Sequence, residues 1–252
     1  MARRVIDAGF DVVLWARRPE SLEPYADTKA TFANSVAELG AQVDFCGICV
    51  VDDNGVKDVF SQLLPAMSAG SLIAIHSTVT PTLCIQLAKD AAEKGITLID
   101  APVSGGGPGA EAGTLTVMAG GDPEAIEKLK PVFDTYSSLV AHLGDVGTGQ
   151  YAKLVNNSMM AANLAVADHS FALADALGID PKGFAELVRV SSGRSFAFEV
   201  RARMSQASEF AHGAKLLDKD VRLLGDALGK DSESYDAIRD LANQFLSQAL
   251  DN

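Results

Sequence analysis

Residues 99–121 read IDAPVSGGGPGAEAGTLTVMAGG, so a strand-like run, a glycine-rich run and a second strand-like run follow one another directly. The two apolar runs predict strands at Ile96–Asp100 and Thr114–Ala119. In an α/β sheet the carboxyl ends of the strands bind ligands, and backbone N–H groups with one hydroxyl can hold an anion there. We therefore expect an anion-binding loop at this edge, formed by Ser104, Gly105, Gly106 and Gly107. The alternative interpretation is a mobile turn that holds no ligand.

The same alternation of strand and helix extends over about the first 145 residues. Further strands are predicted at Asp11–Ala16, Phe45–Val51 and Ser71–His76. Helix-like segments lie between the strands, at Pro19–Ala26, Val56–Leu64, Thr82–Lys94 and Pro123–Tyr136. Near-continuous apolar strands are typical of a parallel sheet that is covered on both faces. The sequence thus predicts the α/β class, with a doubly wound parallel sheet of Rossmann type.

The composition changes after the glycine-rich residues 143–149. Gln150–Leu177 contains neither Gly nor Pro, which predicts one helix of roughly 40 Å. Apolar residues occur on most of its faces, so other helices or another subunit should bury it. Four more helices are expected beyond it, at Lys182–Val190, Ser195–Met204, Ala214–Leu228 and Ser234–Leu250. We therefore predict two domains, an α/β domain over 1–148 and an all-helical domain over 149–252.

Composition excludes several classes of partner. The 21 Lys and Arg against 33 Asp and Glu give a net charge of −12, which argues against nucleic acid or an anionic membrane surface as the main partner. No apolar run reaches the ~18–20 residues of a membrane span, and the N-terminus does not have the pattern of a signal peptide. Three scattered cysteines favour a reducing compartment, so a cytoplasmic protein is expected. Cys46 and Cys49 both fall in a predicted buried strand and are interpreted as core residues. The four histidines lack the spacing of metal ligands, so no metal site is predicted.

Lys153 is the candidate catalytic residue. It lies at the beginning of the long helix, which carries almost no other charge before Asp168. Asn157 is four residues further on, so both side chains share one helical face. A lysine here loses hydration unless it faces a cleft, and loss of hydration lowers the pKa of a lysine from ~10.4. A lowered pKa makes the side chain a usable proton donor or acceptor near neutral pH. The alternative is a solvated lysine on a helix surface.

Two arginines, Arg17 and Arg18, follow the Asp11–Ala16 strand. An acidic residue at this place in a Rossmann domain binds the ribose of NAD, whereas an arginine suits the 2′-phosphate of NADP. The position therefore predicts NADP as cofactor, with NAD as the alternative, unless both arginines are simply surface residues. Lys219 lies in the charged triplet Asp218–Asp220, a pattern typical of a solvated helix face.

These motifs together resemble signatures of the β-hydroxyacid dehydrogenase family, of the 3-hydroxyisobutyrate dehydrogenase type. The resemblance rests on Asp100–Gly106 with Gly113–Met118, on Gly147–Asn157, on Ser77–Pro81 and on Lys219–Val221. It implies an NAD(P)-dependent oxidoreductase that interconverts a small β-hydroxyacid and its semialdehyde by hydride transfer, as a homodimer or homotetramer. The implied roles are general acid/base for Lys153, substrate binding for Ser104, Gly105, Gly106 and Asn157, and dinucleotide contact for Thr78 and Lys219.

The chain departs from the family pattern at its start. The family begins with a strand and a Gly-x-Gly-x-x-Gly turn that holds the pyrophosphate at a helix N-terminus. Met1–Arg4 corresponds to the helix after that turn, so the first strand and the glycine loop are missing from this sequence. We expect weakened dinucleotide binding from this difference. The alternative function is a truncated, catalytically impaired family member that serves as a binding or oligomerisation module.

Overall fold

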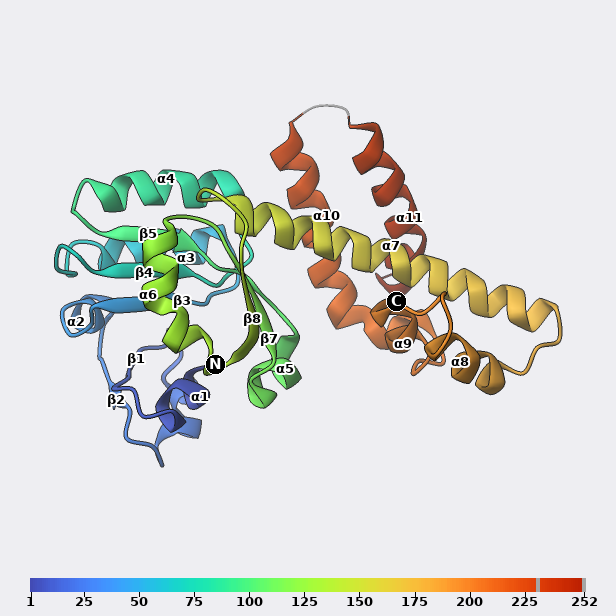
Figure 1. Ribbon diagram of the computed structural model, residues 1–252, viewed down its shortest axis with the longest axis horizontal. Helices are drawn as coiled ribbons and strands as arrows, with labels where there is room; N and C mark the ends of the chain where they lie inside the picture. Colours follow the sequence, from blue (N-terminus) through green and yellow to red (C-terminus); the bar gives the residue numbers. More distant parts are fainter. Residues whose placement is uncertain (230–231, 251–252) are drawn as a thin grey trace. The chain divides into compact units, whose positions relative to one another are not determined.

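The computed structural model describes residues 1–229 and 232–250. The chain divides into two compact units, Met1–Lys153 and Leu154–Asn252, and the long helix runs across this division (Figure 1). The first unit is a mixed α/β fold of Rossmann type and the second is helical, which confirms the predicted fold class. The predicted boundary between residues 148 and 149 stays a prediction.

The strands of the first unit form three small sheets. They are β1 (Val13–Leu14), β2 (Thr31–Phe32), β3 (Phe45–Ile48), β4 (Leu72–Ile75), β5 (Thr97–Asp100), β6 (Val103–Ser104), β7 (Leu115–Ala119) and β8 (Ser137–His142). The pairs β1–β2, β3–β4, β4–β5 and β7–β8 are parallel, and only β6–β7 is antiparallel among the described pairs. An isolated bridge between Asp100 and Gly120 joins the end of β5 to the end of β7. The carboxyl ends of β5 and β7 therefore lie next to each other.

Most helices of the first unit begin at a polar cap or a proline. They are α1 (Ala2–Asp7), the 3-10 helix η1 (Pro19–Tyr25), α2 (Val36–Gly40), α3 (Asp53–Leu63), α4 (Pro81–Ala92), α5 (Gly106–Ala112) and α6 (Pro123–Phe133). Asp52 accepts from the Gly55 N–H at the start of α3, and Asp122 accepts from two N–H groups at the start of α6. Such caps satisfy N–H groups that have no partner inside the helix.

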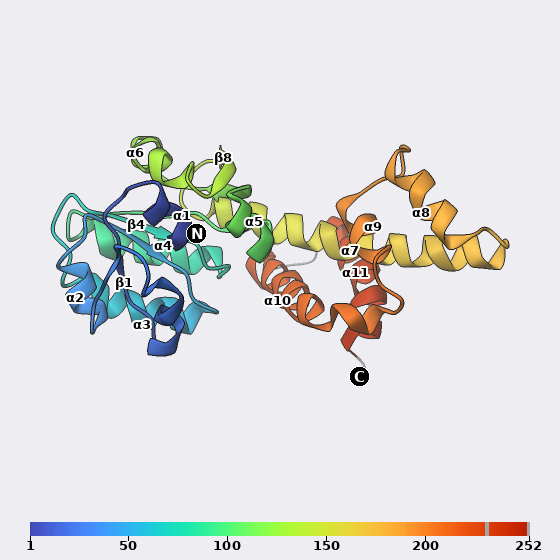
Figure 2. The same ribbon diagram turned by 90° about the horizontal axis from the view of Figure 1, so that it is seen from below.

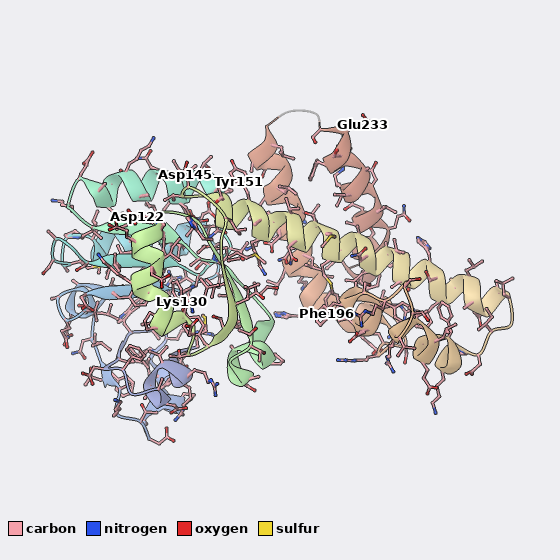
Figure 3. All side chains as sticks on the ribbon, in the orientation of Figure 1. Asp122, Lys130, Asp145, Tyr151, Phe196 and Glu233 are labelled. Atoms are coloured by element: carbon pink, nitrogen blue, oxygen red, sulfur yellow. The ribbon has the colours of Figure 1, made fainter. Side chains whose placement is uncertain are left out.

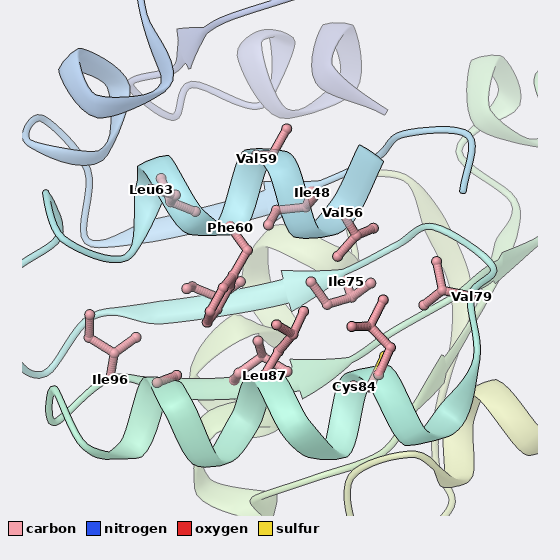
Figure 4. Packing of buried hydrophobic residues seen from close by; sticks show 14 of the residues in the cluster. Ile48, Val56, Val59, Phe60, Leu63, Ile75, Val79, Cys84, Leu87 and Ile96 are labelled. Atoms are coloured by element: carbon pink, nitrogen blue, oxygen red, sulfur yellow. The ribbon is translucent and has the colours of Figure 1, made fainter. Parts of the chain in front are cut away.

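Alternating side chains of the central sheet reach two different cores. Ile73, Ile75 and Leu98 belong to a core that includes residues of α3 and α4, whereas Ala74 and Ile99 belong to a core that includes residues of α6 and β7. Figure 4 shows Phe60 of α3 and Leu87 of α4 in the first of these cores, with Ile48 and Ile75 of the sheet. The sheet is thus covered on both faces, as the apolar runs predicted.

Two expectations about the first unit are wrong. The glycine run is not a loop, because Gly106–Ala112 forms α5; Gly105 and Gly106 start it with φ of +123° and +61°, conformations that favour glycine. Cys49 is not a core residue, because β3 ends at Ile48 and leaves Cys49 exposed beyond it. Cys46 is half-buried inside β3, and burial raises the pKa of its thiol to about 12.

The second unit packs short helices and a helix pair around the long helix α7 (Thr148–Ala176), as Figure 2 shows. Its other helices are α8 (Pro181–Arg189), α9 (Phe196–Arg201), the 3-10 helix η2 (Ala207–Phe210), α10 (Ala211–Leu228) and α11 (Glu233–Leu250). One core joins residues of α7, α10 and α11, and a smaller one joins residues of α7, α8 and α9. Within the described residues, no helix combines the length and the apolar character that a membrane crossing requires.

Candidate active site

A buried carboxylate fixes the beginning of α7. Asp100, at the carboxyl end of β5, is fully buried; its Oδ1 accepts from the Gly147 N–H and its Oδ2 from the Gln150 N–H, both at 2.7 Å. The first N–H groups of a helix lack intrahelical partners and carry partial positive charge, so this carboxylate acts as a cap. Burial raises the pKa of Asp100 to about 6, against the opposing effect of these N–H donors.

Two glycines allow the backbone of α7 to approach this carboxylate closely. A Cβ at Gly149 would overlap the carbonyl oxygen of Met118, and a Cβ at Gly120 would lie 2.5 Å from Oδ1 of Asp100. Both contacts involve groups that cannot move aside, since Met118 contributes backbone and Asp100 is held by its own hydrogen bonds. The first turn of α7 is therefore seated directly on the ends of β5 and β7. Asp145 and Tyr151 mark this beginning of α7 in Figure 3.

Gln150 joins the same turn to the loop after β4. Its side chain is fully buried; Nε2 donates to the Ser77 carbonyl at 2.8 Å and Oε1 accepts from the Val79 N–H at 3.2 Å. These two bonds hold the backbone on both sides of Thr78, which is half-buried. Thr80 donates from its hydroxyl to Asp53 at the start of α3. The loop that carries Thr78 is thus fixed to two helices.

Lys153 lies one turn into α7, three residues after Gln150. Only 8% of Lys153 is exposed. Since Asp100 and Gln150 fix the first turn of α7 against β5 and the loop after β4, they also fix the backbone of Lys153 relative to the carboxyl ends of these strands. A solvated lysine, the alternative considered from the sequence, does not match this burial.

The predicted substrate-binding segment begins directly after the anchor. Ser104 is half-buried in β6, where it pairs with Thr116 of β7, and Gly105 and Gly106 start α5. Asp100 lies four residues before Ser104 on the same segment. The motif noted in the sequence therefore combines a residue that anchors α7 with the residues expected to bind substrate.

In the second unit, Asn157 and Lys219 meet at one carboxylate. Nδ2 of Asn157 donates to Oδ2 of Asp220 at 2.5 Å, and Nζ of Lys219 lies 3.5 Å from its Oδ1. Asp220 is 3% exposed and Lys219 is half-buried. The expectation of a solvated charged triplet is therefore wrong, because the 3.6-residue helical period turns Asp220 toward the core side of α10.

Arg17 lies beyond β1 with its guanidinium mostly exposed. Its Nη2 is 3.3 Å from Oδ2 of Asp58 on α3, and the two side chains are 64% and 57% exposed. An exposed ion pair of this kind contributes little to stability. The guanidinium therefore remains accessible to an anionic ligand.

Sequence reasoning missed three residues that organise the site: Asp100, Gln150 and Asp220. Asp100 and Asp220 stand inside quoted motifs, and Gln150 precedes Lys153 by one turn. For Asp100 the available signal was a polar residue at the end of an apolar strand, because such a residue needs hydrogen-bond partners when it is buried. Among the described residues, no group of three or more His, Cys, Asp or Glu side chains could hold a metal ion.

Comparison with known proteins gives matches along almost the whole chain. Residues 1–144 match the family described as the NAD binding domain of 6-phosphogluconate dehydrogenase. Residues 147–251 match the family described as "NAD-binding of NADP-dependent 3-hydroxyisobutyrate dehydrogenase".

Individual relatives agree with these matches. The chain is 40% identical over 187 residues to 2-(hydroxymethyl)glutarate dehydrogenase of Eubacterium barkeri, covering 73% of this chain and 62% of that protein. It is 41% identical over 150 residues to NAD-dependent L-serine dehydrogenase of Pseudomonas aeruginosa, covering 60% of this chain and 48% of that protein. The chain thus spans less than two thirds of the length of either relative.

A solved structure shows the same fold. The 3-hydroxyisobutyrate dehydrogenase of Mycobacterium tuberculosis, solved with L-serine, superimposes with a TM-score of 0.84 at 24% identity, covering 98% of this chain and 89% of that one. The fold, the two matched NAD-binding families and these relatives place the chain in the β-hydroxyacid dehydrogenase family.

Proposed function

We propose that the protein is an NADP-dependent oxidoreductase that interconverts a small β-hydroxyacid and its semialdehyde. The observation that carries the proposal is Lys153, a buried lysine on a helical turn that Asp100 and Gln150 fix against the ends of two strands. A positioned, poorly hydrated lysine is suited to general acid–base catalysis.

The names of the relatives support the substrate class. Both 2-(hydroxymethyl)glutarate and L-serine carry a primary hydroxyl on the carbon next to the one that bears a carboxylate. An acid of this kind offers an anionic group for recognition and a hydroxyl for oxidation. The substituent on the central carbon differs between the two, so the common part is the β-hydroxyacid unit.

The sequence lacks the glycine turn for the pyrophosphate, but it contains other residues that suit a nicotinamide dinucleotide. Arg17 offers an exposed guanidinium for a phosphate, and Thr78 stands on a loop that is already ordered by Gln150. A bound nicotinamide would supply hydride transfer to and from the hydroxyl carbon. The proposed contacts of the dinucleotide are Arg17, Thr78 and Lys219.

The chain's own residues would handle the proton and the substrate. During oxidation, Nζ of Lys153 takes the proton of the substrate hydroxyl while the hydride leaves the carbon that bears this hydroxyl. During reduction, Nζ returns the proton to the oxygen. Asn157 would orient the substrate near Lys153, and Ser104, Gly105 and Gly106 would hold its carboxylate. Positioning of this kind accounts for much of the rate in such reactions.

Replacement of Lys153 tests the proposal. In Lys153→Met, which keeps an unbranched buried side chain, we expect turnover of hydroxyacids to fall about 10²–10⁴-fold, the usual contribution of one acid/base group. NADP affinity, measured by calorimetry, should change only a few-fold. Lys128→Met, at an exposed position on α6, is the matched control and should keep full activity. Activity of Lys153→Met close to that of the control would refute the assigned role.

A further inference from the structure

The segment expected to bind substrate runs antiparallel to β7. This antiparallel ladder begins at the bridge between Asp100 and Gly120 and ends at the pair of Ser104 and Thr116. Directly opposite residues of such a ladder have their side chains on the same face, with Cβ atoms about 5 Å apart. The side chains of Ser104 and Thr116 are therefore direct neighbours.

One face of this ladder is covered by a core of the first unit. Side chains alternate between the two faces, and those that reach this core are Ala101, Val103, Leu115, Val117 and Ala119. Asp100 points to the opposite face, where its carboxylate holds the first turn of α7. Ser104 is four residues after Asp100, an even number, so it lies on the same face as Asp100. The Ser104–Thr116 pair therefore shares a face with the beginning of the helix that carries Lys153.

The two hydroxyls of this pair are available to a ligand. Ser104 and Thr116 are half-buried, and neither side chain hydrogen-bonds to another residue in the part of the chain that the structure describes. By contrast, the hydroxyl of Thr80, which is also half-buried, donates to Asp53. A half-buried hydroxyl that bonds to no protein group bonds to water or to a ligand. The pair thus offers two neighbouring donors beside the start of α7.

We propose that Thr116 is a further substrate-binding residue, whose hydroxyl donates to the substrate carboxylate next to the hydroxyl of Ser104. The inference rests on the proposed function, in which Ser104, Gly105 and Gly106 hold this carboxylate. An ionised carboxylate has two oxygens and about four acceptor sites. One hydroxyl from each strand therefore leaves acceptor sites for the backbone of Gly105 and Gly106.

The charge of the carboxylate gives this contact a specific signature. Hydrogen bonds to an ionised acceptor are roughly twice as strong as those between neutral groups. Thr116 should therefore contribute more to the binding of an acid than to the binding of the corresponding amide. A residue that only stabilised the two strands would affect both ligands equally.

Kinetics of Thr116→Val test the contact, with the best of L-serine, 2-(hydroxymethyl)glutarate and 3-hydroxypropionate as substrate. Valine removes the hydroxyl and keeps a β-branched side chain on the strand. KM should rise about 10–100-fold, the usual effect of a lost hydrogen bond to a charged group, while kcat changes only a few-fold. Thr116→Ser keeps the hydroxyl and should recover most of the affinity. Thr97→Val, at a half-buried position on β5, is the matched control and should keep the KM of the wild type.

Propionate and propionamide, used as competitive inhibitors, separate a carboxylate contact from a structural effect. In Thr116→Val the inhibition constant of propionate should rise by the same factor as KM, and that of propionamide should change little. NADP affinity, measured by calorimetry, should equal that of Thr97→Val.

The outcomes distinguish this inference from the proposed function. Equal weakening of both inhibitors, or a Thr116→Val variant with the KM of the control, would overturn the inference, while turnover that Lys153→Met abolishes would still support the proposed function. A wild type that oxidises none of the three acids would overturn the proposed function and this inference with it.

Discussion

Asp100 couples the ionisation of one carboxyl group to the stability of the first unit. Its pKa is raised from 3.8 to about 6 in the folded chain, mainly because the group is buried. A group with a raised pKa contributes most to stability below its unfolded value, and this contribution is lost as the pH rises through the folded value. The stability of the wild type should therefore decrease relative to Asp100→Asn as the pH rises from about 4 to about 7.

The size of this effect can be stated. A shift of the Asp100 pKa from 3.8 to about 6 changes the difference in unfolding free energy between the wild type and Asp100→Asn by about 3 kcal/mol. Urea unfolding of both proteins across the pH range measures it. Asn at this position also turns an amide NH₂ toward N–H donors, so the variant should be less stable than the wild type at every pH. A difference that does not vary with pH would show that Asp100 does not titrate in this range.

Arg17 and Asp58 give a prediction about cofactor choice. The 2′-phosphate of NADP would approach the Arg17 guanidinium next to the Asp58 carboxylate, which repels it. Asp58→Asn should therefore tighten NADP binding several-fold, and Arg17→Ala should weaken it. NAD lacks this phosphate, so its affinity should change little in either variant. Calorimetric titration of both cofactors measures the four changes, and equal effects on NAD and NADP would contradict the position assigned to the phosphate.

For individual residues, the sequence indicated which side chains are functional better than it indicated the residues that they contact. The isolated charge of Lys153 and its spacing from Asn157 could be read from α7 alone, but the local sequence does not tell which carboxylate Asn157 binds. Asn157 on α7 and Asp220 on α10 are 63 residues apart in the sequence. Contacts of this kind depend on how helices pack, which one sequence does not specify.

The first turn of α7 can lie against the ends of β5 and β7 only because Gly149 has no side chain. A Cβ at Gly149 would overlap the Met118 carbonyl oxygen and approach Asp100, so Gly149→Ala must displace α7 from the strand ends. We expect a loss of more than about 2 kcal/mol in the unfolding free energy, as for other overpacked sites. Gly107→Ala is the matched control, because a Cβ there meets nothing within 4 Å. Chemical denaturation compares the two, and equal stabilities would contradict the close approach.

Elements were predictable where their pattern is long and regular. Each of the five predicted strand segments contains an observed strand, and the long helix was expected at Gln150–Leu177 against an observed Thr148–Ala176. The two-residue strands β2 and β6 have too few residues for a period of two to be seen. The helix α5 was missed because its glycines favour turns in isolation, and Pro24 inside Pro19–Tyr25 makes that segment a 3-10 helix.

The whole chain contains two sets of cores that share no residues. The first unit is built around residues such as Phe133, and the second around residues such as Phe245; both side chains are fully buried. Units with their own cores can open separately, so the chain should not unfold in a single two-state step.

Truncation of each phenylalanine tests this. Loss of a buried aromatic side chain typically costs about 3–5 kcal/mol. Phe245→Ala should therefore speed amide hydrogen exchange in α10 and α11 by several orders of magnitude while β4 and β5 keep their protection. Phe133→Ala should have the reverse effect, with faster exchange in β4, β5 and α6 and unchanged protection in α10 and α11. If either substitution lowered protection equally in both units, the chain would instead unfold as one cooperative body, and the division at Lys153 would have no energetic meaning.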